Sequence, residues 1–164
     1  MAAWNIHFGG GDPWGQAQAI ANSGADVVAL QEAQTWEENM PATYPDRLRQ
    51  LTGQAWYSVW AGAAECSGGC QGTLILSRFP IVDTSVVNLS GMATARALVD
   101  VGGVRVNVFS VHLEYYDTSL RSTQLLQFMD WSRSFGGPRI VGGDFNSWWG
   151  EWWIRQMESE YSDT

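Results

Sequence analysis

Two polar side chains follow a short apolar run near the end of this chain. Residues 142–146 read Gly-Gly-Asp-Phe-Asn and come directly after Ile140 and Val141. In an extended segment the side chains at i and i+2 point the same way, so we expect Asp144 and Asn146 to project together while Phe145 turns into the core. A carboxylate and an amide so placed hold and polarise a water beside a phosphate. The alternative is an ordinary polar turn, since Gly, Asp and Asn are common turn residues.

Three other apolar runs also end in residues able to do chemistry. They are residues 4–6 (Trp-Asn-Ile), residues 25–32 (Ala-Asp-Val-Val-Ala-Leu-Gln-Glu) and residues 108–113 (Val-Phe-Ser-Val-His-Leu). With residues 142–146 they make four motifs whose order and spacing resemble those of the endonuclease/exonuclease/phosphatase superfamily, the deoxyribonuclease I-like proteins. The resemblance spans nearly all of residues 3–164. It implies an α/β fold, a four-layer αββα sandwich with the site at one edge between the sheets.

The resemblance assigns Glu32 as a metal ligand and places Asn5 beside it. An unpaired buried carboxylate is expensive, and Mg²⁺ prefers oxygen ligands, typically one or two carboxylates with waters and substrate phosphate. We therefore expect Mg²⁺ or Mn²⁺ near Glu32, with Asn5 holding phosphate, the metal or a metal-bound water. The alternatives are an exposed strand-end or helix-capping glutamate at position 32 and a buried turn amide at position 5.

The same resemblance assigns three catalytic residues. His112 would hold the scissile phosphate or stabilise charge developing on it, since imidazole donates a hydrogen bond from either nitrogen. Asp144 would orient the attacking water, and Asn146 would donate hydrogen bonds to the transition-state oxygens. A structural strand-end histidine is the alternative for His112. His7 lies either next to these residues or on the surface.

Several further residues are candidates for contact with the substrate. Arg96 opens a strand, and an arginine at a cleft clamps a phosphate through two hydrogen bonds. Tyr115 and Tyr116 either stack on a substrate base or pack. The tryptophans of the loop after residue 146 either anchor a short helix by i, i+3 and i, i+4 contacts or form a substrate wall; they are Trp148, Trp149, Trp152 and Trp153.

Regions typical of the family after residue 146 are absent from these 164 residues. The family completes its sheet with an Arg-x-Asp strand and then a Ser-Asp-His motif, whose histidine is the general base. No histidine follows His112 here. We therefore expect a single domain, residues 1–164, that is incomplete at its C-terminus, lacks the last strands, exposes a sheet edge and is feebly active at most.

Charge and apolar content restrict the classes of partner that we expect. The formal net charge is −8, and all nine basic residues are arginine, so strong nonspecific binding to duplex DNA is not expected. No apolar run is long enough to span a membrane, and the start does not read as a signal peptide, which predicts a cytoplasmic protein if the start is genuine. Cys66 and Cys70 are expected as a disulfide or as two free thiols, rather than as a zinc site.

The pattern of apolar residues alternates short strands with fewer helices. The expected strands are 3–7, 25–30, 55–60, 72–77, 82–89, 95–101, 104–111 and 139–141. The expected helices are 13–23, 36–51, 119–135 and 148–158. Gly102 and Gly103 supply the positive φ angles of a tight hairpin turn between two of the strands.

These observations predict a metal-dependent phosphoric ester hydrolase that attacks a phosphodiester with an activated water. The substrates of the family include nucleic acids, inositol phosphates and sphingomyelin, and fold alone does not choose among them. The alternative is a module that binds a metal and a ligand without turnover, because its site is catalytically incomplete.

Overall fold

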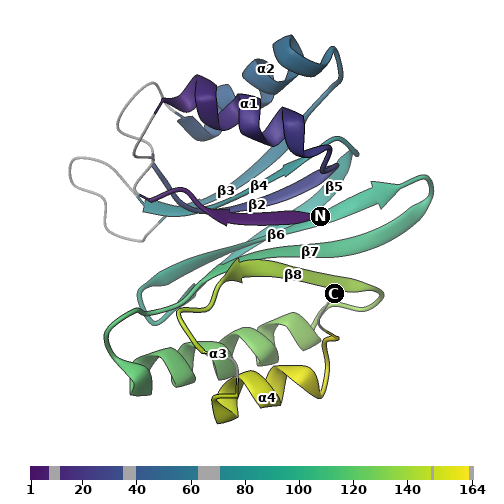
Figure 1. Ribbon diagram of the computed structural model, residues 1–164. Coiled ribbons are helices and arrows are strands. Elements are labelled where there is room, and N and C mark those ends of the chain that lie inside the picture. Colours follow the sequence, from purple (N-terminus) through teal and green to yellow (C-terminus); the bar gives the residue numbers. More distant parts are fainter. Residues whose placement is uncertain (8–11, 35–39, 63–70, 149, 163–164) are drawn as a thin grey trace.

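Two four-stranded sheets pack face to face between pairs of helices (Figure 1). The computed structural model describes residues 1–7, 12–34, 40–62, 71–148 and 150–162. The first sheet contains, in spatial order, β1 (Ala2–Asn5), β2 (Val27–Gln34), β4 (Gln71–Ser77) and β3 (Tyr57–Gly62). The second contains, in spatial order, β5 (Ile81–Leu89), β6 (Met92–Val101), β7 (Val104–His112) and β8 (Arg139–Asp144).

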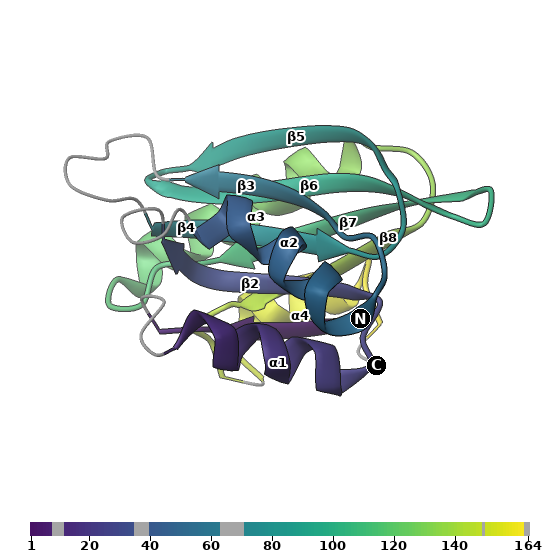
Figure 2. The same cartoon turned by 90° about the horizontal axis from the view of Figure 1, so that it is seen from above.

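Two helices cover the outer face of each sheet. The helices α1 (Pro13–Ser23) and α2 (Met40–Thr52) lie on the first sheet. The helices α3 (Thr118–Arg133) and α4 (Trp152–Glu158) lie on the second, and the view from above shows α1 and α2 over the strands (Figure 2). The four-layer αββα sandwich expected from the sequence is therefore confirmed.

Three apolar layers hold the sandwich together. Leu30 and Leu48 belong to the layer between the first sheet and its helices. Ile75 lies between the two sheets, and Phe109 and Phe128 lie between the second sheet and α3. Each of these side chains is fully buried, which stabilises the fold by about 1.5–3 kcal/mol per side chain.

Parallel pairing gathers the ends of four strands at one end of the sandwich. β1 pairs with β2 in parallel, with Asn5 opposite Gln31. β7 pairs with β8 in parallel, with His112 opposite Asp144. Because parallel strands finish at the same edge, the residues at their carboxyl ends are neighbours, and contacts between β1 and β8 join the two sheets here.

The helix ends follow from their capping residues. The Asp12 carboxylate accepts hydrogen bonds from the backbone of Trp14 and Gly15, at 3.0 and 3.1 Å, and Pro13 opens α1. Gly24 closes that helix with a φ of 68°. The sequence-based bounds of α1 are right. In the second expected helix, residues 36–39 lie outside the described part of the chain, as do Cys66 and Cys70.

One edge of the second sheet is open in the described structure. β8 has β7 as its one described partner, and its other edge faces a groove of about 680 Å³ beside α4, lined by residues such as Ile140, Phe145, Ile154 and Tyr161. An open sheet has two edge strands, here β5 and β8, so the expectation that closing strands are missing beside β8 stays a prediction. None of the described helices is both long and apolar enough to cross a lipid bilayer.

Candidate active site

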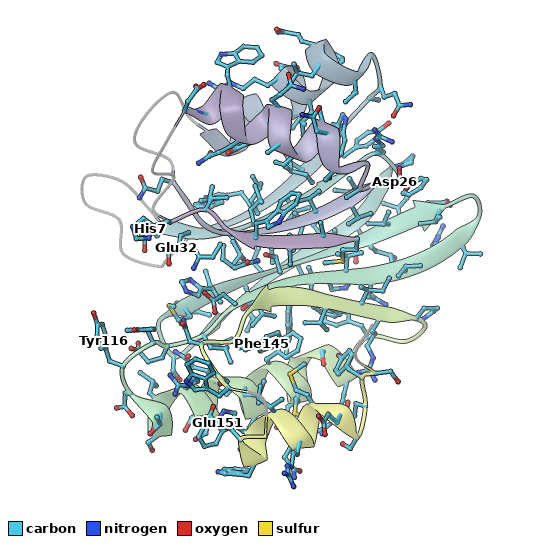
Figure 3. All side chains as sticks on the ribbon, viewed as in Figure 1. His7, Asp26, Glu32, Tyr116, Phe145 and Glu151 are labelled. Carbon is cyan, nitrogen blue, oxygen red and sulfur yellow. The ribbon has the colours of Figure 1, made fainter. Side chains whose placement is uncertain are left out.

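A side chain on β1 joins the two sheets at the end where the four motifs meet. The Asn5 Nδ2 atom donates to the Glu32 Oε1 atom at 2.8 Å and to the Asp144 Oδ2 atom at 2.9 Å. Its Oδ1 atom accepts from the backbone N–H of His7 at 2.9 Å. These partners fix the orientation of the amide, because a rotated amide would place its oxygen against two carboxylates. Figure 3 shows His7 and Glu32 side by side at this end and Asp26 at the other end of β2.

Glu32 reaches this position through an irregular backbone. The pairing of β2 with β4 shifts register between Leu30 and Ala33, and Glu32 has a φ of 58°. Such a bulge turns a side chain away from the direction that strand alternation would give it. A non-glycine residue in this region of φ costs of order 1–3 kcal/mol, and such strain concentrates at functional sites.

The two glycines before Asp144 let β8 approach its neighbours closely. A Cβ atom on Gly142 would lie 2.5 Å from the Met1 Cε atom and 3.1 Å from the Ala3 Cβ atom. On Gly143 it would lie 2.2 Å from the Val111 carbonyl oxygen. A larger residue at position 143 would push β8 away from β7, and one at position 142 would crowd Met1 and Ala3, so the two glycines allow the close approach that positions Asp144.

His112 ends β7 beside the same carboxylates. Its Nε2 atom lies 3.8 Å from the Glu32 Oε1 atom, and both side chains are mostly buried. Burial lowers the pKa of His112, although the carboxylates of Asp144, Glu32 and Glu114 oppose this shift. The imidazole is therefore neutral at neutral pH and has one donor and one acceptor nitrogen.

A buried hydrogen-bond chain between the sheets lies next to the site, and the sequence analysis missed it. The Gln31 Nε2 atom donates to the Ser110 Oγ atom at 3.1 Å, and that hydroxyl donates to the Leu30 carbonyl at 3.1 Å. Gln31 precedes Glu32 and Ser110 is two residues before His112, so these bonds fix the spacing of the two site residues. Gln31 and Ser110 are polar residues within apolar runs. Because buried polar groups need hydrogen-bond partners, this pattern could have indicated such a bond.

The loop after β8 differs from its expected extended form. Asn146 has a φ of 48°. Its backbone N–H donates to the Asp144 Oδ1 atom at 2.9 Å, and its Nδ2 atom donates to the Leu113 carbonyl at 2.8 Å. The i, i+2 argument for Asp144 and Asn146 therefore fails, although both remain at the same end of the sheet. Phe145 packs against the core of the second sheet, as expected.

The structure does not bring Arg96 to this group. Its guanidinium is buried, donates to Asn107 Oδ1 at 2.7 Å and to Asp83 Oδ2 at 2.8 Å, and lies 3.9 Å from the centre of the Phe135 ring. Phe135 belongs to the core between the second sheet and α3. The side chain thus faces away from the other sheet. The hypothesis that Arg96 clamps a phosphate is wrong. The sequence does not show whether Arg96 lies on the face of β6 that meets the other sheet or on the face that meets α3.

The aromatic candidates divide between anchors and exposed rings. Trp153 is half-buried and its Nε1 atom donates to the Ser147 Oγ atom at 2.9 Å, so it anchors α4. Trp148 and Trp152 are exposed, as are Tyr115 and Tyr116; Trp149 lies outside the described residues.

The donor set is compatible with a cation that keeps most of its waters. Among the described residues, no three His, Cys, Asp or Glu side chains converge as a complete metal cage. The carboxylates of Glu32 and Asp144 nevertheless meet at one nitrogen. Two carboxylates are what Mg²⁺ typically takes from a protein, and a cation between them offsets their mutual repulsion. Asn5 presents its nitrogen to this space, so in this orientation it aligns the carboxylates and is not itself a ligand.

Residues 2–164 match the model of the Endonuclease/Exonuclease/phosphatase family. The chain belongs to that family. It is 30% identical over 145 residues to the uncharacterized protein YbhP of Escherichia coli, a match that covers 79% of this chain and 57% of that protein. The chain spans about half the length of the curated relatives that it matches.

Two solved structures share the fold of this chain. A family protein from Leptotrichia buccalis superposes with a TM-score of 0.77 at 16% identity, covering 96% of this chain and 72% of that one. Sphingomyelinase C from Streptomyces griseocarneus superposes with a TM-score of 0.69 at 20% identity, covering 96% and 67% of the two chains. At these identities the likeness establishes the fold alone.

Proposed function

We propose that this protein is a metal-dependent phosphoric ester hydrolase that attacks a phosphodiester with an activated water. The observation that carries the proposal is the convergence of two carboxylates on the Asn5 amide, beside the neutral imidazole of His112. Family membership supports the class of reaction. One structural neighbour is named as a sphingomyelinase, and because sphingomyelin is a phosphodiester, that name favours a diester substrate.

Glu32 and Asp144 are the proposed ligands of Mg²⁺ or Mn²⁺. A divalent cation held by these two carboxylates would withdraw charge from phosphate oxygens and would position the ester for attack. Asn5 keeps the two carboxylates at a fixed separation through its two hydrogen bonds. The Gly142 and Gly143 backbone and the Gln31–Ser110 bond hold the two sheets at the distance that this arrangement needs.

The remaining polar groups act on the phosphate and the water. Neutral His112 donates one hydrogen bond to a phosphate oxygen, where charge develops in the transition state. Asp144 is acceptor-only when ionised, so it orients the hydrogens of the attacking water. Asn146 uses one amide hydrogen on the Leu113 carbonyl and has a second for a phosphate oxygen.

A second candidate is a module that binds a metal and a phosphate ester without turnover. Its support is the histidine content, since His7 and His112 are the two histidines of these 164 residues. His112 is already assigned to the phosphate. A general base contributes about 10²–10⁴ in rate, and in this candidate none of the described side chains supplies it.

A phosphodiesterase assay separates the two candidates. The protein is incubated with a chromogenic phosphodiester in Mg²⁺, in Mn²⁺ and in chelator. Hydrolysis that requires metal and is lost in Glu32→Gln supports the enzyme. Absence of hydrolysis, together with metal binding that depends on Glu32, supports the binding module. Hydrolysis that persists in Glu32→Gln would contradict both. Asp26→Asn is the matched control, because Asp26 lies just before β2 at the opposite end.

A further inference from the structure

Exposed aromatic side chains border the candidate active site. Tyr115 and Tyr116 follow His112 closely and are 65% and 88% exposed, and Trp148 follows Asn146 and is 83% exposed. We call these three residues, Tyr115, Tyr116 and Trp148, the aromatic rim. Figure 3 shows Tyr116 projecting from the fold on the side where His7 and Glu32 lie. The Tyr115 and Tyr116 rings pack edge to face against each other, with 4.7 Å between their centroids, and both rings remain largely in solvent.

The first loop of the aromatic rim is held firmly to the site. The Leu113 N–H donates to the Asp144 carbonyl at 3.0 Å, and the Leu113 carbonyl accepts from Asn146 at 2.8 Å. The buried Arg121 guanidinium donates to the Tyr115 carbonyl at 2.7 Å. The backbone of this loop is therefore fixed beside the carboxylates, while its two tyrosine rings remain in solvent.

The second loop is fixed through the same arginine. Arg121 lies over the ring of Trp153, 6.0 Å from its centre, and Trp153 donates to Ser147. The Trp148 N–H donates to the Glu151 carboxylate at 3.1 Å. Both loops are thus tied to α3 and hold three exposed rings at the border of one site.

The charges around the aromatic rim restrict what it binds. In residues 113–120 and 146–153, every charged side chain is acidic: Glu114, Asp117 and Glu151. Acidic residues repel a phosphate-rich nucleic acid backbone and an anionic lipid surface. The same acidic residues disfavour a nucleotide whose base would stack on the exposed rings, because its phosphate is held close to that base.

We propose that the aromatic rim docks the protein on a lipid surface with zwitterionic headgroups. Tyrosine and tryptophan favour the boundary between headgroups and water, where an apolar ring and a polar tip are both accommodated. Docking through these loops brings the Asn5–Glu32–Asp144 group to the phosphates of the headgroups. The inference rests on the proposed function where it names a lipid phosphodiester as substrate, whereas docking itself does not require turnover.

Vesicle flotation tests the proposal without any catalytic readout. The protein is mixed with vesicles of phosphatidylcholine and with vesicles that also contain phosphatidylserine. We expect it to float with phosphatidylcholine and to gain nothing from phosphatidylserine. Replacing the aromatic rim (Tyr115→Ser, Tyr116→Ser, Trp148→Ser) should lower the partition coefficient at least about tenfold, since burying one large apolar side chain is worth about that much. The single variant Trp148→Ser, whose side chain is almost free of contacts, should show part of the same loss.

A matched control removes three exposed apolar side chains at the opposite end of the sandwich. Tyr57, Val101 and Val104 are 40%, 37% and 57% exposed, and the strand registers place them away from Glu32 and His112. The variant with serine at all three positions should float like the wild type.

Four results would overturn the proposal. Two are failure of the wild-type protein to float and flotation of the aromatic rim variant as efficiently as the wild type. A third is flotation that requires phosphatidylserine. The fourth is quenching of the protein's fluorescence by adenosine monophosphate without any vesicle binding. Titrating the same preparations with Mg²⁺ distinguishes failure of docking from failure of the proposed function.

Discussion

The polar cluster around Asn5 and the polar cluster around Arg96 are built on opposite electrostatic principles. Arg96 joins unlike partners, since its guanidinium donates to the Asp83 carboxylate and to the Asn107 amide oxygen. Asn5 instead holds the two like charges of Glu32 and Asp144 together. The Arg96 arrangement pairs a cation with an anion, whereas the Asn5 arrangement brings two carboxylates to one neutral amide.

The backbone differs in the same way. The described non-glycine residues with positive φ include His7, Glu32 and Asn146, which lie in or next to the Asn5 cluster, and Ser90, in the turn between β5 and β6 at the same end of the sandwich. None of the Arg96 partners has a positive φ. Strain and like charge persist where the surrounding fold imposes them, and both make sense when a cation and a phosphate complete the site. The comparison teaches that charge compensation, rather than burial, separates the structural cluster from the functional one.

The largest contrast between the clusters should be in turnover. Replacing Asp144 by Asn keeps the shape of the side chain and removes its charge, so kcat for a chromogenic phosphodiester in Mg²⁺ should fall by about 10²–10³. Asp130→Asn, on the exposed surface of α3, should leave kcat unchanged. Circular dichroism checks that both variants are folded. Equal kcat values for the Asp144→Asn variant and the wild type would remove Asp144 from the catalytic group.

The Arg96 cluster should show the larger effect on stability. Arg96→Met leaves the buried Asn107 oxygen without its donor and should lower the free energy of unfolding by about 1–3 kcal/mol. Chemical denaturation measures this loss, with Arg105→Met on an exposed part of β7 as the control. If Arg96→Met lowered turnover without lowering stability, Arg96 would have to be returned to the active site.

The smallest contrast should be in the dependence of stability on pH. Burial lowers the pKa of His112, so the unfolded chain binds more protons as the pH falls through the ordinary value of 6.5. In metal-free protein, the free energy of unfolding should therefore decrease as the pH falls below that value. The decrease should be smaller in the His112→Gln variant.

The Arg96 cluster responds at a more acidic pH. The hydrogen bond from Arg96 lowers the pKa of Asp83 below its ordinary 3.8. The contribution of this pair to the free energy of unfolding is therefore present above that value and is lost as the pH falls further. Chemical denaturation across the pH range would show the two steps. A wild type and a His112→Gln variant with the same pH dependence near neutrality would contradict the first step.

The sequence predicted the fold in most of its parts because most strands are short runs rich in apolar residues, and because α1 and α3 each begin after an aspartate that caps the helix. The bounds of α1 follow from Asp12, Pro13 and Gly24, which are local signals. The αββα arrangement came from the family resemblance. Local patterns do not reveal that β2 bulges at Glu32, because the bulge depends on pairing with β4.

The sequence predicted most residues of the candidate site, but it did not predict the contacts between them. Asn5, His112 and Asp144 end β1, β7 and β8, whose parallel partners bring such ends together, whereas Glu32 lies in a bulge two residues before the end of β2. The bridging role of Asn5 was not predicted, since it depends on the amide orientation that the His7 N–H imposes. The position of Arg96 was missed because Phe135 and Asn107, its neighbours, are far from it in sequence.

Calorimetric titration with Mg²⁺ tests most directly whether the Asn5 cluster is a cation site. The wild type should bind Mg²⁺, and Glu32→Gln should bind at least about tenfold more weakly, since it removes one of two proposed carboxylate ligands. Asp26→Asn is the control, because Asp26 belongs to the same sequence motif as Glu32 but lies at the other end of β2. This variant should bind Mg²⁺ like the wild type. Equal affinities of the wild type and Glu32→Gln, or no binding by either, would contradict the proposed metal site.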